Sequence, residues 1–199
     1  YPEGLSEVMD YIRRKGMKPG IWLELESVGL DCAGLQNMPK EWFFQRHGKP
    51  VIDSGRVHLD FRVKEVRERA SAILKRVISR YHLGYIKIDY NLELSCGTEF
   101  QADSPADGML QHNRAYLAWL EEEHAKYSEV MFENCGSGGL RMDYGMLSRM
   151  DIQSVSDQED YRIMAVIAAN SASAVLPEQA GIWTYPLKDA DRESCIMNM

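Results

Sequence analysis

The feature that most constrains the fold of this chain is a short, mostly apolar run that recurs and ends each time in an acid or an amide. Five such runs occur, at residues 19–24, 85–89, 130–133, 152–157 and, more weakly, 174–179. Short runs of this kind are typical of strands in a parallel sheet, which is buried on both faces. We therefore expect five strands with polar groups at their carboxyl ends.

Helical stretches separate these runs. Apolar residues at helical spacing predict helices over residues 4–15, 63–81, 108–127 and 160–169. Each is long enough to cross back over a sheet between parallel strands. Residues 25–61 are different, because they are rich in Gly, Pro and turn residues and too long for an ordinary connection. We expect this segment to be a functional loop that covers a site.

Alternating strands and helices with charged strand ends indicate an α/β fold of the (β/α)₈ TIM-barrel class, in which chemistry gathers at the carboxyl ends of the strands. The rival is a Rossmann-like open sheet, but no GxGxxG follows a strand. About five of the eight βα units occur here. We therefore interpret residues 1–199 as the central part of a single, incomplete catalytic barrel, and we expect a longer protein because the chain starts at Tyr1 and stops at Met199 within a predicted helix.

Composition argues against several classes of partner. The chain is 45% hydrophobic and 27% charged, which suits a globular domain with a real core. A net charge of −7 without long Lys/Arg runs argues against nucleic acid or an anionic membrane surface as partner. The longest apolar runs are too short to span a bilayer.

The four cysteines form no CxxC pair and have no His at metal-ligand spacing. We expect neither a metal site nor a cofactor. Scattered cysteines favour free thiols in a reducing compartment over disulfides, so we expect a cytoplasmic protein, of bacterial origin.

Lys87 and Asp89 lie two residues apart on a predicted strand, so their side chains share one face. One interpretation is a buried ion pair that fills the barrel. The other is a nucleophilic carboxylate whose pKa is lowered by the neighbouring ammonium. The two residues alone leave both interpretations open.

Two further motifs follow later strands. Residues 133–143 form a Gly-rich turn, interpreted either as plain turn chemistry or as a place where the backbone approaches a ligand closely. Asp157 lies at a predicted strand end, whereas Asp160 suits the start of the next helix. Asp157 and Asp89 could face each other across the barrel mouth, which is the carboxylate pair that glycoside hydrolysis needs.

Taken in order, residues 16–24, 87–91, 133–143 and 156–160 resemble the motifs of the melibiase-type α-galactosidases, glycoside hydrolase family thirty-six in clan D. The resemblance runs from near Tyr1 to about Pro186. It implies removal of terminal α-linked galactose by retaining double displacement, with Asp89 as nucleophile and Asp157 as acid/base. The two carboxyl groups should then lie about 5–5.5 Å apart in the intact enzyme.

The resemblance also implies substrate contacts, flanking domains and no cofactor. It places an upstream β-sandwich and a C-terminal β domain around the barrel, and it leaves a homo-oligomer open. The partner would be an α-galactoside oligosaccharide. The residues implied in sugar binding are Lys87, Asn91, Cys135 and Gly138, with Arg56 and Trp42 from the long loop.

The chain departs from the family pattern at four places, one of which is residues 176–183, which differ from the commonest form. Ser154-Val155-Ser156-Asp157 replaces the usual Trp-Thr-Ser-Asp, so an aromatic wall is either missing or supplied from elsewhere. Ile88 replaces a Trp, and Leu25 replaces a Pro. The alternatives are therefore a related α-glycosidase such as an α-N-acetylgalactosaminidase, a galactosyl transferase of the raffinose-synthase kind, or a degenerate barrel that only binds carbohydrate.

Overall fold

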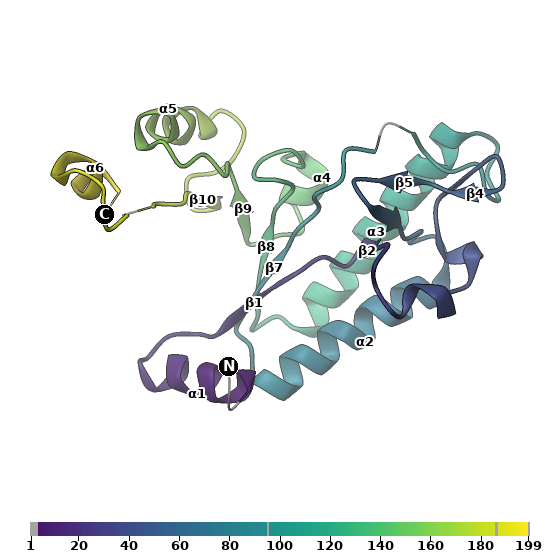
Figure 1. The fold of residues 1–199 in the computed structure, drawn as a ribbon, viewed down its shortest axis with the longest axis horizontal. Coiled ribbons are helices and arrows are strands. Elements are labelled where there is room, and N and C mark those ends of the chain that lie inside the picture. The colour runs from purple at the N-terminus through teal and green to yellow at the C-terminus, as the bar shows by residue number, and fades with distance from the viewer. Residues whose placement is uncertain (1–3, 95, 186, 199) are drawn as a thin grey trace.

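The computed structural model describes residues 4–94, 96–185 and 187–198, so Tyr1, Pro186 and Met199 lie outside the described residues. Its centre is a sheet of five strands in the order β1-β7-β8-β9-β10 (Figure 1), and every neighbouring pair is parallel. The strands are β1 Gly20–Leu23, β7 Tyr85–Ile88, β8 Met131–Asn134, β9 Ile152–Ser154 and β10 Ala180–Gly181. The parallel α/β fold predicted from the strand pattern is confirmed.

The fifth strand lies later in the chain than predicted, so the strand expected at residues 174–179 is wrong. Those residues form turns, in which the backbone N–H of Val175 donates to the Ser171 carbonyl at 2.9 Å. Pro177 has no N–H to donate to a ladder, which disfavours a strand there. Pairing with β9 begins at Ala180, opposite Gln153.

The predicted helices are confirmed, with ends moved by a few residues. The six helices of the described residues are α1 Leu5–Arg14, α2 Lys64–Tyr81, α3 Pro105–Lys126, α4 Tyr144–Leu147, α5 Tyr161–Ser171 and α6 Arg192–Met197. Asp160 caps α5 by accepting the N–H of Arg162 at 2.9 Å, which confirms its interpretation as a helix-start residue. None of these helices combines the length and apolarity that crossing a membrane would need.

Helices α2 and α3 lie side by side next to β7 and β8 (Figure 1) and bury one face of the sheet. Strand side chains alternate, so Ile86, Ile88 and Phe132 point into this core while Lys87 points to the other face. The helices contribute Val66, Ala70, Leu74, Tyr116, Trp119 and Leu120. The face opposite these helices is therefore the one that carries the polar side chains.

Residues 25–61 are structured rather than a plain loop. They contain β2 Ser27–Gly29, the 3₁₀ turns η1 Leu35–Asn37 and η2 Lys40–Trp42, and the short strands β3 Gln45–Arg46, β4 Lys49–Pro50, β5 Ile52–Asp53 and β6 Arg56–His58. The sheet β2-β6-β5 is antiparallel. Ser54 and Gly55, at φ 47° and 74°, make the tight turn between β5 and β6. That turn brings Arg56 back toward the carboxyl end of β1.

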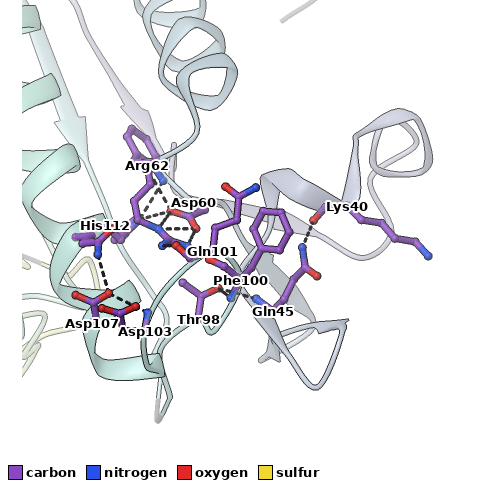
Figure 2. Close-up of polar contacts among 12 residues, drawn as sticks. Lys40, Gln45, Asp60, Arg62, Thr98, Phe100, Gln101, Asp103, Asp107 and His112 are labelled. Atoms are coloured by element: carbon purple, nitrogen blue, oxygen red, sulfur yellow. Dashed lines mark hydrogen bonds and ion pairs between the residues drawn. The ribbon is translucent and has the colours of Figure 1, made fainter.

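A polar network ties this segment to the residues that precede α3 (Figure 2). The Arg62 guanidinium is paired with Asp60 and donates to the carbonyls of Phe100 at 2.6 Å and Gln101 at 3.1 Å. The N–H of Gln45 donates to Thr98 Oγ1 at 3.1 Å. These bonds hold the long segment against the residues that precede α3.

Candidate active site

The polar face is built by strand register. Trp22 of β1 pairs with Lys87 of β7, which in turn pairs with Glu133 of β8. Because side chains two residues apart share a face, Asp89 continues the row that begins with Lys87. Three neighbouring strands thus bring an indole, an ammonium and carboxylates to one place without any long loop.

Asp89 is held by three hydrogen bonds and is 7% exposed. Its Oδ2 accepts from Trp22 Nε1 at 2.9 Å and from Asn91 Nδ2 at 3.0 Å, and its Oδ1 accepts from the backbone N–H of Tyr90 at 2.8 Å. Burial raises the pKa of Asp89, but these donors outweigh it and leave the pKa below its ordinary value. The carboxylate is therefore ionised and oriented.

Lys87 makes its ion pair with Glu133 rather than with Asp89. Its Nζ lies 3.2 Å from Oε1 of Glu133, which is fully buried, and the Tyr85 hydroxyl donates to Oε2 of the same carboxylate. Burial lowers the pKa of Lys87, but Glu133 together with Cys135 and Asp89 outweighs it, and the pKa is raised. The buried ion pair considered from sequence therefore exists with a different partner, and hydrogen bonds, not the ammonium, keep Asp89 ionised.

Asn91 connects Asp89 to the surrounding elements. Its Nδ2 also donates to Glu24 Oε1 at 3.0 Å, and its Oδ1 accepts from the Ser137 hydroxyl at 2.8 Å. Arg56 Nη1 lies 3.2 Å from both Glu24 Oε1 and the Asn91 carbonyl. The structure thus brings together the predicted residues Arg56, Asn91 and Asp89.

The Gly-rich turn packs against the chain that carries Asp157. Gly138 has φ +81°, its N–H donates to Cys135 Sγ at 3.4 Å, and a Cβ on it would lie 2.8 Å from Ser156 Cα and 2.9 Å from the Asp157 nitrogen. Cys135 is buried, and burial raises the pKa of its thiol. Glycine is required here because the turn approaches another backbone segment closely.

Two predicted residues are not joined to this hydrogen-bonded set. Asp157 is exposed and follows β9, and none of the contacts in the described ranges links its carboxylate to Asp89. Trp42 lies on η2 and packs against the hydrophobic core. The roles of Asp157 as acid/base and of Trp42 beside the sugar stay predictions.

Sequence reasoning missed three residues of the site: Trp22, Glu24 and Glu133. Trp22 and Glu24 alternate at the end of β1 as Lys87 and Asp89 do at the end of β7, and this alternation was the available signal. Glu133 was noted only as a strand end. Its ion pair depends on register between strands, which the sequence does not show.

A second buried polar cluster lies beside the site. Glu26 Oε1 accepts from Arg141 Nη1 at 2.6 Å, and its Oε2 lies 3.6 Å from His112 Nε2. Burial raises the pKa of Glu26, but the Arg141 charge together with His112 and His58 outweighs it, so the pKa is about 2. Burial, with the neighbouring His112, lowers the pKa of His58 to about 3, so His58 is neutral. These residues line a cavity of about 370 Å³.

This cluster contains atoms that could ligate a metal cation, but the groups around them disfavour cation binding. Ligand atoms of Glu26, His58 and His112 lie within 4.8 Å of one another. The Arg141 guanidinium already neutralises Glu26 and would repel a divalent ion. Moreover, the Phe61 N–H donates to His112 Nδ1 at 3.0 Å, which uses that lone pair. We interpret the cluster as an anchor that fixes Arg141 and, with it, the Gly-rich turn to which Arg141 belongs.

Comparison with known proteins agrees with this geometry. The melibiase family model matches residues 1–185. The α-galactosidase Mel36A of Lactobacillus acidophilus is 29% identical over 149 residues, which is 73% of this chain and 20% of that protein. An α-galactosidase of Escherichia coli is 28% identical over 185 residues, covering 91% of this chain and 25% of its own length.

Solved structures show the same fold. The α-galactosidase of Lactobacillus brevis superposes with a TM-score of 0.82 at 22% identity, over 96% of this chain and 26% of that one. A variant of AgaA from Geobacillus stearothermophilus, crystallised with raffinose, gives 0.83 at 18% identity over 98% of this chain and 28% of that one. The chain thus spans a quarter or less of the length of the Lactobacillus acidophilus and Escherichia coli proteins. Because the family model covers nearly the whole chain, the protein belongs to the melibiase family.

Proposed function

We propose that residues 1–199 are the central part of the (β/α)₈ catalytic barrel of a retaining α-galactosidase. The observation that carries the proposal is Asp89, an ionised carboxylate at the carboxyl end of a parallel strand, held by Trp22 and Asn91. Membership of the melibiase family supports the substrate class. The remaining strands and the flanking β domains would lie in the rest of a longer protein.

In the proposed reaction, Asp89 attacks the anomeric carbon of a terminal α-galactosyl unit. Asp157 donates a proton to the departing glycosidic oxygen, and a covalent glycosyl-Asp89 ester forms. Asp157 then removes a proton from water, which attacks the anomeric carbon and releases galactose with its configuration retained. The donors on Asp89 favour its carboxylate form and therefore help it to leave in the second step.

The sugar hydroxyls would contact the polar groups around Asp89. Lys87 is charged and only partly buried, and Arg56 and Asn91 reach the same place from other segments. Relatives of this chain were crystallised with raffinose and stachyose, so oligosaccharides with a terminal α-galactosyl unit are the proposed substrates. Transfer to a sugar acceptor is the alternative outcome of the same glycosyl-enzyme.

A panel of nitrophenyl α-glycosides tests the proposal, with the full-length protein that carries this chain. We expect hydrolysis of the α-galactoside with α-galactose as the first product in a proton NMR time course. Hydrolysis of a different α-glycoside would correct the sugar, and β-galactose as first product would contradict retention.

The nucleophile is tested by Asp89→Ala with and without azide. We expect loss of turnover in the variant and, with azide, formation of β-galactosyl azide, because azide can take the place of the missing carboxylate. Asp157→Ala is the matched control: azide attacks the glycosyl-enzyme that Asp89 still forms and gives the α-galactosyl azide. Retained hydrolysis by Asp89→Ala would contradict the assignment.

A further inference from the structure

Trp183 joins the polar face from outside the four motifs at residues 16–24, 87–91, 133–143 and 156–160. It follows β10, and its indole N–H donates to Ser154 Oγ of β9 at 2.9 Å. The Lys87 ammonium lies 4.4 Å from the centroid of the Trp183 ring. The indole therefore bridges β9 and β7, and one of its faces is occupied by the cation.

The contact depends on the small side chain at position 154. Ser154 is fully buried and pairs with Gly181, two residues before Trp183. The Ser154 hydroxyl offers an acceptor to an indole that arrives from the residues after β10.

The Lys87 side chain is fixed from two sides. Glu133 holds the ammonium at 3.2 Å, and the Tyr85 hydroxyl in turn binds the Glu133 carboxylate. The Trp183 indole is the second fixed neighbour of the ammonium. A Lys side chain has many rotamers, and each fixed neighbour lowers the entropy lost when the ammonium binds a ligand.

We propose that Trp183 is a positioning residue that holds the Lys87 ammonium in place for the sugar. The proposal rests on the proposed function. It also gives a role to Ser154, which accepts the Trp183 indole N–H.

The test is a double-mutant cycle in the full-length protein. Trp183→Ala should raise KM for nitrophenyl α-galactoside roughly three- to thirtyfold, the range of a partly desolvated cation–π contact, with a smaller change in kcat. In a Lys87→Met background the same substitution should change KM by less than about twofold, because the cation is gone. An equal loss in both backgrounds, or no loss in either, would overturn the proposal.

Two further variants separate positioning from folding. Trp183→Phe keeps a ring and loses the N–H, and Ser154→Ala loses the acceptor. The KM of both variants should lie between that of the wild type and that of Trp183→Ala. A KM higher than that of Trp183→Ala in either variant would contradict the proposal. If Lys87→Met turns over too slowly for KM to be measured, the same four proteins can be made in the inactive Asp89→Asn background. The cycle is then built from the Kd of nitrophenyl α-galactoside, measured by calorimetry. A wild-type protein that hydrolyses no α-galactoside would contradict the proposed function, whereas an active wild type with no coupling would contradict only the role of Trp183.

Discussion

At the scale of single residues, the carboxylate of Asp89 shows how hydrogen-bond donors keep a buried acid ionised. Burial disfavours its charge, and the donors Trp22, Asn91 and the Tyr90 backbone reverse that effect. The nearest ammonium, Lys87, is instead neutralised by Glu133. The hydrogen bonds favour the ionised form of the carboxylate and also fix its orientation. An ion pair with a flexible lysine would fix the orientation less well.

The hydrogen bond from Trp22 to Asp89 leads to a prediction about how activity depends on pH. Trp22→Phe removes one hydrogen bond to Oδ2, so the pKa of Asp89 should rise. Because the nucleophile must be ionised, activity is present above the pKa of Asp89 and is lost as pH falls through it. The acidic limb of kcat/KM should therefore move to higher pH in the variant, measured with nitrophenyl α-galactoside.

Trp119→Phe is the matched control for that prediction. It also loses an indole N–H hydrogen bond, but to Ser71 Oγ at 2.9 Å in the helical core. We expect lower stability and an unchanged acidic limb. If the acidic limb of kcat/KM in Trp22→Phe stays at its wild-type pH, Trp22 does not lower the pKa of Asp89.

At the scale of elements, local patterns predicted four of the five strands and the longer helices, because alternation and helical spacing are local properties. The strand near residue 174 was misplaced because Pro177 and the pairing partner decide where a short strand starts. In the site, the sequence predicts that Lys87, Asp89 and Asn91 lie close together, because they share one strand end. It does not predict that Trp22 and Glu133 join them, because the register between strands is set by tertiary packing.

The turn that contains Gly138 gives a prediction about an element. Gly138→Ala would place a Cβ 2.8 Å from Ser156 Cα at a positive φ, so both strain and overlap apply. We expect the free energy of unfolding to fall by about 2–4 kcal/mol and kcat to fall, because Asp157 must move. Urea denaturation and steady-state kinetics measure the two effects.

Gly48→Ala is the control, since Gly48 also has a positive φ of 71° but nothing lies within 4 Å of the place that its new Cβ would take. It should cost only the backbone strain of about 1–2 kcal/mol and leave kcat unchanged. Equal effects of the two substitutions on kcat would contradict the proposed link between the turn and Asp157.

At the scale of the whole molecule, the pair Glu26–Arg141 joins segments 115 residues apart and fixes the Gly-rich turn against the end of β1. Replacing Glu26 by Gln leaves the Arg141 charge buried without a counter-ion. We expect the free energy of unfolding to fall by about 3–5 kcal/mol, measured by urea denaturation at neutral pH. Glu68→Gln, which breaks the exposed pair with Lys64, should change little.

The same pair predicts how stability depends on pH. The pKa of Glu26 is about 2 in the folded chain against an ordinary value of 4.5. Its contribution is therefore complete above the unfolded value and is lost as pH falls from there toward about 2. Urea midpoints measured across this window should fall less in Glu26→Gln than in wild type, and parallel curves would contradict the assignment.

The sequence by itself determined that acid-tipped strands alternate with helices and that Lys87, Asp89 and Asn91 share one strand end, because side-chain alternation and helical periodicity are written locally. Only the tertiary structure decided which groups meet there: Trp22 at Asp89, Glu133 at Lys87, and Trp183 over Lys87 from beyond β10. The physical reason is that partners across parallel strands are set by register and by packed helical crossovers. Residues far apart in the chain become neighbours only when the sheet forms.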